Sequence, residues 1–452
     1  MRHFFRTILL LTCSYICNVG IMASTTVSPT NPNIQYVGRI DFSTPDKPLF
    51  AFPNVTIKAK FEGTSIDLLL KNYTSTTSGN NYFVSIVDKG TPTKFAVNTT
   101  TQTYSIAKNL TDGVHTVEII KVTESYYGGC QFLGFQLDDG KTLLAPDPLA
   151  NLKIEFYGNS ITCGFGNDGS TQPAADNSYK AYAAVAARDL NAQIQTISYS
   201  GIGVAQGATG TEKMGVVYNK IIATPSSTSS TATPIPSINS WDFTKYVPNV
   251  VVVALGTNDW TWLSGLSSGT ASVVTTFKTA YNNLLTQIRT SYPNAKIVCT
   301  NSPMVQSVNL ATYINAVITS RNDNNISYFG YTYKSGGGLY GHPSAAEGQA
   351  DGLLLSAYIK TILNSSSIKN TTDSENDIYL FPNPVEKVLK FKDLKKTKSI
   401  EISDLNGKII KKINVLLHDD ISIDVSELTK GIYIISIISN DGSKVEKKVT
   451  KI

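Results

Sequence analysis

The sequence predicts an α/β domain with a parallel sheet that lies, along the chain, between two domains built from β-strands. Residues 33–148 and the last 75 residues consist of short apolar-polar alternations separated by turn residues, which is typical of antiparallel strands. Residues 150–364 instead alternate apolar strand-like runs with helix-like stretches. A length of 452 residues agrees with this division, because a chain of that size is expected to form about three domains.

The first 23 residues predict a secretory signal peptide. Residues 1–6 are basic, an apolar stretch follows as far as Met22, and Ala23 is a small residue at its exit. The stretch is shorter than the roughly 20 apolar residues of a membrane span, so no stable span is expected. Export is therefore favoured, with a retained anchor or a lipid-modified Cys13 as alternatives.

The first β domain is expected over residues 30–148. Its strand-like runs are residues 54–61, 65–70, 82–87, 115–120 and 130–135, and turns that contain glycine recur between them. No helical period appears, so these residues predict an antiparallel β-sandwich.

The α/β domain is expected over residues 150–364. Its strand-like runs are residues 153–157, 194–199, 250–255 and 296–300, and its helix-like stretches are residues 178–190, 270–291 and 345–363. This order predicts a parallel sheet with helices on both faces and a ligand beyond the carboxyl ends of its strands. Residues 224–240 are rich in Ser, Thr and Pro and are expected to form an exposed loop.

A polar linker is expected at residues 365–377, followed by a small β-sandwich at residues 378–452. This last segment holds 14 Lys and 10 acidic residues, which account for +4 of the formal net charge of +5. The rest of the chain is nearly neutral and has no recognisable basic motif. Nucleic acid is therefore not expected as a partner.

Only Cys130, Cys163 and Cys299 follow the signal peptide. Three cysteines cannot form a complete disulfide framework, and either one bridge or three buried thiols would fit. No group of Cys and His residues has the spacing of metal ligands, so neither a metal nor an organic cofactor is expected.

Three polar residues of the α/β domain suggest a catalytic site. Ser160 follows the run 153–157 in Gly-Asn-Ser-Ile-Thr-Cys, Asn258 follows the run 250–255 in Gly-Thr-Asn-Asp, and His342 lies in Gly-His-Pro-Ser. A serine nucleophile needs a base to take its proton and donors to hold the oxyanion. His342 is the only histidine of this domain, although taken alone it would read as a surface residue beside a helix start.

The expected oxyanion donors are the Asn258 amide and the backbone N–H groups of Ser160 and Gly203, with Gly201 as the alternative to Gly203. Glycines in this position also commonly do no more than shape a turn.

Aromatic residues near these blocks are candidates for sugar binding. Trp260 and Trp262 directly follow Asn258 and could stack on a pyranose ring, or could pack in the core or a loop. Tyr331 and Tyr333 are weaker candidates.

The blocks around Ser160, Gly203, Asn258 and His342, in that order, resemble the four sequence blocks of SGNH hydrolases. Over residues 33–363 the chain resembles carbohydrate esterase family 2 more specifically, because residues 113–124 are similar to the His and Lys-x-Thr-Glu pattern of that family's N-terminal jelly roll. The resemblance implies a three-layer α/β/α domain preceded by a jelly-roll sandwich.

The same resemblance implies a serine esterase that removes acetyl groups from plant polysaccharides such as acetylated xylan or glucomannan. Ser160 would form the acyl-enzyme, with His342 as general base and acid. Ser160, Gly203 and Asn258 would form the oxyanion hole.

The chain departs from the SGNH pattern in two ways. Asn159 stands where an aspartate is usual, and Leu339 and Tyr340 occupy the positions before His342 where an aspartate is common. Some members of the family are thought to orient the histidine through a backbone carbonyl, so a Ser160–His342 dyad is the hypothesis.

Three nearby acidic residues are expected to have other roles. Asp351 and Glu347 should point along the helix after His342, and Asp259 should brace its own loop.

The tail resembles the type A sorting domain of the type IX (Por) secretion system, through Leu-Phe-Pro-Asn-Pro-Val at 380–385 and Gly-Ile-Tyr-Ile-Ile at 431–435. This implies a small Ig-like sandwich, the secretion machinery as a partner, and a secreted or cell-surface protein. A carbohydrate-binding sandwich is the alternative.

Two other functions fit the same residues. One is an esterase that acts on lipids or on acetylated bacterial wall glycans. The other is a glycan-binding protein with a decayed catalytic site, suggested by Asn159 and by the missing aspartate.

Overall fold

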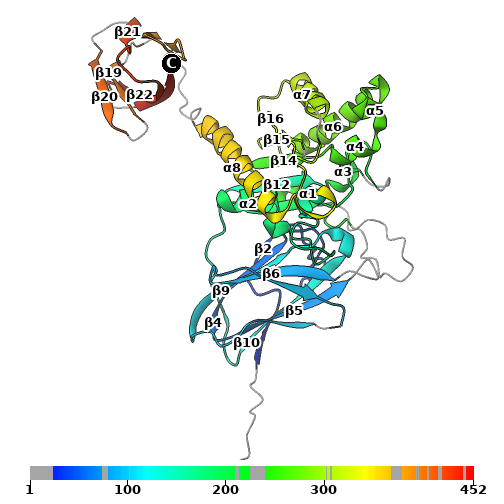
Figure 1. Cartoon of the computed structure of the whole chain (residues 1–452). Coiled ribbons are helices and arrows are strands. Elements are labelled where there is room, and N and C mark those ends of the chain that lie inside the picture. Colours follow the sequence, from blue (N-terminus) through cyan, green and yellow to red (C-terminus); the bar gives the residue numbers. More distant parts are fainter. Residues whose placement is uncertain are drawn as a thin grey trace, which may run out of the picture. The chain divides into compact units, whose positions relative to one another are not determined.

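The computed structural model describes residues 24–73, 80–100, 102–208, 213–223, 240–301, 303–305, 308–367, 379–392, 394, 397–404, 407–415, 420–440 and 444–452. The chain divides into two compact units, residues 1–363 and residues 364–452 (Figure 1). The predicted signal peptide and the segments 224–239 and 368–377 lie outside the described residues.

The first unit begins with the predicted antiparallel sandwich. Its strands are β1 (Ser24–Val27), β2 (Gln35–Val37), β3 (Leu49–Phe50), β4 (Thr56–Gly63), β5 (Ile66–Tyr73), β6 (Asn81–Val87), β7 (Thr93–Val97), β8 (Thr103–Ala107), β9 (Gly113–Lys121), β10 (Gly129–Asp138) and β11 (Leu143–Leu144), with a short 3-10 helix η1 (Ser125–Tyr127). One sheet has the order β1-β10-β5-β8 with β3 beside β10, and the other has the order β11-β4-β9-β6-β7 with β2 beside β4. Alternate residues such as Phe61, Leu68 and Phe132 fill the core between the sheets.

The α/β part contains one parallel sheet with the order β13-β12-β14-β15-β16. Its strands are β12 (Lys153–Gly158), β13 (Gln193–Ser198), β14 (Val250–Ala254), β15 (Lys296–Thr300) and β16 (Ile326–Phe329). In this order the chain reverses direction across the sheet between β12 and β14. Such a switch point leaves a crevice at the carboxyl ends of the two strands, where ligands bind.

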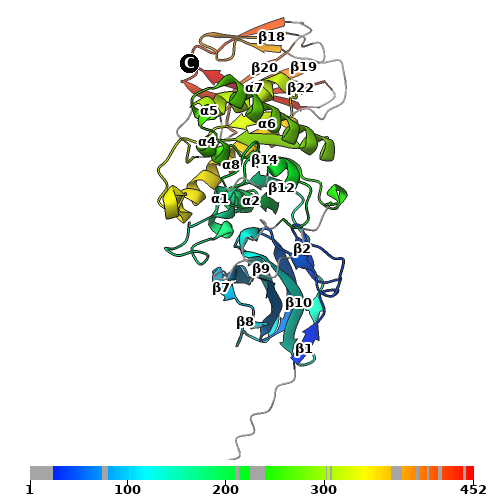
Figure 2. The ribbon, with the colours of Figure 1, turned by 90° about the vertical axis from the view of Figure 1, so that its right-hand side faces the viewer.

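Helices cover both faces of this sheet, as predicted (Figures 1 and 2). The helices are α1 (Ser160–Cys163), α2 (Tyr182–Asp189), α3 (Met214–Val217), α4 (Thr257–Trp262), α5 (Ser264–Ser267), α6 (Ala271–Ser291), α7 (Val308–Arg321) and α8 (Ala345–Ser367), with 3-10 turns η2 (Ser178–Lys180), η3 (Phe243–Lys245) and η4 (Leu339–Gly341). Val251 and Val253 of β14 pack with Phe277 of α6 on one face, and Val250 and Val252 pack with residues of α2 and α8 on the other.

These elements confirm the predicted α/β class with a parallel sheet between helices. Strand β16 and helix α7 were not predicted. Helix α8 begins at Ala345 as expected and extends four residues beyond the predicted end at 363.

The three cysteines that follow the predicted signal peptide are free and buried. Of the two alternatives, three buried thiols is therefore correct. Burial raises the pKa of the Cys130 and Cys299 thiols to about 12.

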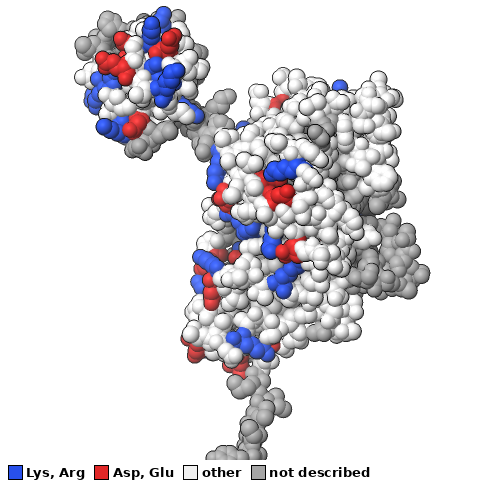
Figure 3. Space-filling model, viewed as in Figure 1, with Lys and Arg blue, Asp and Glu red and all other residues white. Residues whose placement is uncertain are grey.

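The second unit contains two antiparallel sheets, with the orders β17-β18-β21 and β20-β19-β22-β23. The strands are β17 (Tyr379–Phe381), β18 (Val388–Lys392), β19 (Thr397–Ser403), β20 (Ile409–Asn414), β21 (Asp420–Asp424), β22 (Gly431–Ser439) and β23 (Lys444–Lys451). Their apolar side chains, including Phe391, Ile402 and Ile435, share one core, as expected for a small sandwich. In Figure 3 charges of both signs are closely spaced on this unit, whereas part of the first unit has a wide uncharged surface.

No helix among the described residues is both long and apolar enough to cross a membrane.

Candidate active site

Ser160 lies at the first position of α1, one residue after strand β12, which is the neighbour of the central strand β14. Asn159 caps this helix, because its Oδ1 accepts a hydrogen bond from the N–H of Ile161 at 3.1 Å. Gly158 permits the tight turn, since a Cβ at this position would lie 1.9 Å from Oγ1 of Thr162. The turn places the Ser160 side chain at the carboxyl end of the sheet, at the switch point between β12 and β14.

His342 lies within hydrogen-bond distance of Ser160. Its Nε2 is 2.8 Å from the Ser160 Oγ, and its Nδ1 is 3.0 Å from the carbonyl oxygen of Leu339. A carbonyl oxygen can only accept, so Nδ1 must carry the proton in this arrangement. Nε2 is then free to accept the proton of the serine hydroxyl.

The His342 ring is half-buried rather than exposed as expected. Its centroid lies 4.6 Å from that of the Phe165 ring. Burial lowers the pKa of His342 below its usual value, and the bond to the Leu339 carbonyl opposes this only in part. The histidine is therefore neutral near pH 7, which a general base requires.

No carboxylate among the described residues hydrogen-bonds to His342. Asp351 pairs with Lys334, with 2.5 Å between Oδ1 and Nζ. Glu347 accepts from the N–H of Gly337 at 2.8 Å and from the N–H of Ser344 at 2.7 Å, so it caps α8. The geometry therefore matches the expected dyad, in which a backbone carbonyl orients the base.

The expected oxyanion donors lie on three neighbouring segments. Ser160 begins α1, and Asn258 lies in the first turn of α4, after β14. The Asn258 Nδ2 donates to the Ile202 carbonyl at 2.8 Å, which leaves its second hydrogen available. This bond connects α4 with the loop after β13, where Gly201 and Gly203 lie.

Gly203 occupies a position that excludes a side chain. A Cβ there would lie 2.0 Å from the Gln206 carbonyl oxygen and 2.9 Å from the Asp259 Oδ2. Gly201 adopts a left-handed φ of 83°. Both glycines are thus required by the loop geometry, and the choice between them as oxyanion donor stays a prediction.

The prediction that Asp259 braces its own loop is wrong. Its buried carboxylate accepts hydrogen bonds from the N–H groups of Val204, Ala205 and Gln206 at 2.9, 2.7 and 2.9 Å. Asp259 therefore fixes the loop after β13, which lies more than 50 residues earlier in the chain.

The two tryptophans differ in exposure. Trp262 is 54% exposed, whereas Trp260 is half-buried and packs against the core. Tyr331 is buried and hydrogen-bonds to the Asp351 carbonyl at 3.2 Å, so it does not present a stacking surface. Tyr333 is 44% exposed. Trp262 is the better candidate for a sugar ring.

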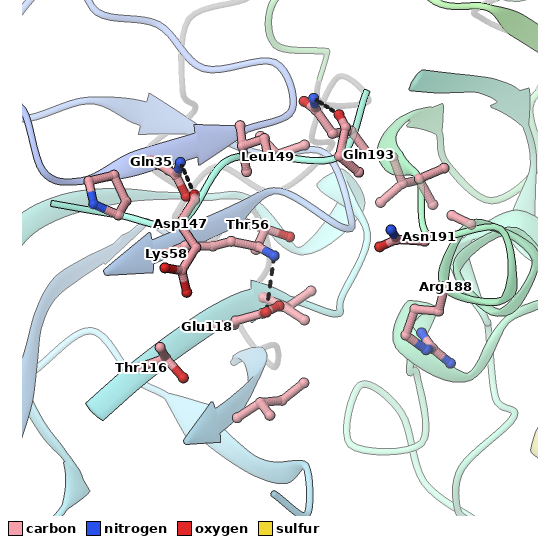
Figure 4. A pocket seen from close by; sticks show the side chains of 18 of the residues that line it. Gln35, Thr56, Lys58, Thr116, Glu118, Asp147, Leu149, Arg188, Asn191 and Gln193 are labelled. Carbon is pink, nitrogen blue, oxygen red and sulfur yellow. Dashed lines mark hydrogen bonds and ion pairs between the residues drawn. The ribbon is translucent and has the colours of Figure 1, made fainter. Parts of the chain in front are cut away.

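A cleft of about 380 Å³ lies between the sandwich and the α/β domain, away from Ser160. Figure 4 shows Lys58 and Glu118 of the sandwich on one side of it and Arg188 and Asn191 on the other. The cleft lies beside the start of β13, which is the opposite end of the sheet from the candidate active site. Lys58 and Glu118 neutralise each other at 3.0 Å.

One contact of His342 and the role of one nearby carboxylate were not predicted from the sequence. The Phe165 ring packs against the imidazole at an interplanar angle of 37°, and nothing in the sequence indicates this neighbour. The role of Glu347 could have been found, because Ser344-Ala-Ala-Glu347 has the spacing of a helix capping box.

Three family models match the chain. Residues 36–147 match the model described as Carbohydrate esterase 2 N-terminal, and residues 156–327 match the GDSL-like Lipase/Acylhydrolase family. Residues 379–451 match the Secretion system C-terminal sorting domain, which confirms the prediction for the tail and its role in secretion.

Two curated relatives have similar sequences. The chain is 37% identical over 354 residues to the cellulase/esterase CelE of Acetivibrio thermocellus, which covers 75% of this chain and 41% of CelE. It is 26% identical over 373 residues to an acetylxylan esterase / glucomannan deacetylase of Cellvibrio japonicus, which covers 79% of this chain and 98% of that protein.

A solved structure has a similar sequence and fold. It is a family two carbohydrate esterase from Clostridium thermocellum in complex with cellohexaose, with 35% identity and a TM-score of 0.62. The similarity covers 73% of this chain and 99% of that one.

Proposed function

Because the chain belongs to carbohydrate esterase family 2, we propose that it is a secreted serine esterase that removes O-acetyl groups from plant polysaccharides such as acetylated xylan or glucomannan. The observation that carries this proposal is the 2.8 Å hydrogen bond between Ser160 Oγ and His342 Nε2. The name of the Cellvibrio japonicus relative supports the choice of substrates.

In the proposed reaction His342 Nε2 takes the hydroxyl proton as Ser160 Oγ attacks the acetyl carbonyl carbon. The negative charge on the carbonyl oxygen is held by N–H groups of Ser160, Asn258 and Gly203. The imidazolium then gives its proton to the sugar oxygen, the bond between that oxygen and the acetyl carbon breaks, and the deacetylated sugar leaves.

A water molecule completes the cycle. His342 takes a proton from the water as the water oxygen attacks the carbonyl carbon of the acetyl group on Ser160. The proton returns to Ser160 Oγ as its bond to the acetyl carbon breaks, and acetate leaves. Throughout, the Leu339 carbonyl accepts the Nδ1–H and supports the positive charge of the imidazolium.

A second candidate function is the binding of glucan chains at the same site. It is suggested by the relative that was solved in complex with cellohexaose. The exposed ring of Trp262 near Asn258 would supply a stacking surface for either glycan.

The test is acetate release from acetylated xylan, acetylated glucomannan and 4-nitrophenyl acetate by the wild type and by Ser160→Ala. We expect activity that falls by a factor of about 10⁶ in the variant while its melting temperature is unchanged. Retained activity in Ser160→Ala would refute the nucleophile. A wild type that binds cellohexaose but releases no acetate would favour the glycan-binding function.

A further inference from the structure

We propose that Glu124, a residue of the jelly-roll sandwich, is a positioning residue of the active site that holds the loop after β13. The inference rests on the proposed esterase function, because this loop carries Gly203. The Glu124 Oε2 accepts from the Ser200 N–H at 2.5 Å, and its Oε1 accepts from the Ser200 hydroxyl at 2.6 Å. Both oxygens of the carboxylate thus bind one residue of the other domain.

Glu124 is held in a buried polar environment. It is 1% exposed, and its neighbour Lys121 is fully buried and donates to the carbonyl oxygens of Thr123 and Glu124 at 2.7 and 3.2 Å. Burial, together with the nearby Asp176 carboxylate, raises the pKa of Glu124 to about 7. A buried acidic group is costly unless its partners compensate it, and Ser200 supplies two hydrogen bonds.

Side chains from other segments hold the loop after β13 at three places along its length. Glu124 holds Ser200, Asn258 holds the Ile202 carbonyl at 2.8 Å, and Asp259 holds the N–H groups that begin at Val204. Two of these fixed points come from α4 of the same domain. Glu124 is the one contributed by the sandwich, and it fixes the loop where it leaves the strand.

Gly203 lies between Ile202 and Val204, the second and third of these held residues. Its N–H can stabilise the oxyanion only if it points at that oxygen. A donor contributes to catalysis only if it is already oriented before charge develops. Releasing Ser200 would free the start of the loop, so that the Gly201 and Ile202 carbonyl oxygens would be held only by the Ala208 N–H and the Asn258 amide. Gly201 has a left-handed φ of 83°, a conformation that glycine can leave easily, so the loop could change its path at this residue. We therefore expect loss of Glu124 to weaken binding of the transition state more than binding of the substrate.

Other contacts of the sandwich with the same end of the sheet support this assignment. Lys94 donates to the carbonyl oxygens of Ala174 and Asp176 at 2.6 and 2.9 Å, and the Asp176 Oδ1 accepts from the Gly166 N–H at 2.6 Å. Gly166 belongs to the segment that follows α1. The sandwich thus contacts both loops that surround Ser160.

The test compares Glu124→Ala, Glu124→Gln and the control Asp138→Ala in the full chain. Asp138 is a sandwich carboxylate that also accepts from backbone N–H and hydroxyl groups, those of Thr64 and Ser65, and none of its hydrogen bonds reaches the loop after β13. We expect Glu124→Ala to lower kcat on 4-nitrophenyl acetate by a factor of about 10 to 100, with KM changed less than about threefold. Glu124→Gln should recover most of this loss, because its amide can accept from the Ser200 N–H and donate to the Ser200 hydroxyl.

A second readout separates positioning from general stability. Affinity for a boronic acid, which mimics the tetrahedral intermediate, should fall in Glu124→Ala by about the same factor as kcat, whereas affinity for cellohexaose should stay within about threefold. If Glu124→Ala lowered the affinity for both ligands equally, and Asp138→Ala lowered it as much, Glu124 would have only a structural role. A wild-type kcat in folded Glu124→Ala would overturn the proposal.

Two further measurements test the inference if Glu124→Ala does not fold or if the proposed esterase function is wrong. If Glu124→Ala fails to fold, Ser200→Ala removes only the hydroxyl bond and should lower kcat by a factor of about 2 to 5; no change would overturn the proposal. If the wild type releases no acetate, the proposed function fails, but amide hydrogen exchange at residues 200–203 still decides whether Glu124 orders the loop. Equal protection in wild type and Glu124→Ala would then refute the inference.

Discussion

Replacing Asp259 with asparagine is expected to lower the free energy of unfolding by about 2 kcal/mol and to slow acetate release. In the structure the carboxylate is fully buried and receives three backbone N–H groups. Oδ1 accepts from Ala205 and Gln206 and, at 3.2 Å, from Val204, whereas Oδ2 accepts from Val204 alone, at 2.9 Å. An asparagine can keep the first oxygen, but its Nδ2 would face the Val204 N–H, so that two donors meet.

The magnitude follows from these bonds. The Val204 N–H would keep only its longer bond to Oδ1 and would face the Nδ2 donor, which costs about 1 to 3 kcal/mol, and the retained bonds weaken because the acceptor loses its charge. Burial raises the pKa of Asp259, so its ionised form is costly, and removing the charge returns part of the loss. Asp259→Ala removes both acceptor oxygens, leaves three backbone N–H groups without their partner and should cost about 3 to 5 kcal/mol.

Thermal unfolding and 4-nitrophenyl acetate hydrolysis of both variants provide the assay. The asparagine variant should melt about 4 °C below the wild type, and the alanine variant lower still. Because Val204 adjoins Gly203, kcat should fall by a factor of about 10 in Asp259→Asn. The reasoning fails if the two variants are equally stable, or if Asp259→Asn matches the wild type in both assays.

Three further predictions follow from burial and exposure. Because burial lowers the pKa of His342, kcat/KM should rise with pH through a midpoint below 6.5 and be constant near pH 7; a midpoint above 6.5 would contradict a buried neutral base. Trp262→Ala should raise KM for acetylated polysaccharide without changing the melting temperature or the rate on 4-nitrophenyl acetate, because this side chain is 54% exposed; loss of both activities would show a structural role instead. Cys130 and Cys299 should react with a thiol reagent only after unfolding, because burial raises their pKa to about 12, and rapid labelling of the native protein would argue against the described core.

Much of the α/β domain could be predicted from the sequence because its central strands are buried on both faces. Such strands read as continuous apolar runs, as residues 250–254 do. Strand β16 escaped prediction because it has four residues at the edge of the sheet and only Ile326 is fully buried. Helix α7 buries Leu310, Ile314 and Val317 on one face, but apolar residues such as the exposed Val308 also lie off this face, so the amphipathic pattern is weak.

The Ser160–His342 pair could be predicted because the chemistry of a serine nucleophile requires a base and one histidine was available. The group that orients His342 could not be identified from the sequence, since any residue supplies a backbone carbonyl. The prediction for Asp259 failed for a related reason. A carboxylate was assigned to its nearest loop along the chain, whereas the parallel sheet brings the ends of β13 and β14 onto one edge.

The sandwich is a structural part of the esterase and not an appended module. Strand β13 is an edge strand of the parallel sheet, and such edges need cover. The sandwich provides it, since the Thr196 hydroxyl of β13 donates to the Pro53 carbonyl at 2.6 Å. Arg39 of the sandwich is buried, donates to the carbonyl oxygens of Tyr218 and Lys220, and lies 3.5 Å from the buried Glu155 of β12.

Separating the two parts would therefore leave charges without partners as well as an open sheet edge. An unpaired buried charge costs about 3 to 5 kcal/mol, which is a large share of the stability of a typical domain. The grouping of residues 1–363 into one compact unit agrees with this dependence. Because the same interface brings Glu124 to Ser200, the contacts that stabilise the α/β domain also reach the loop on which its proposed chemistry depends.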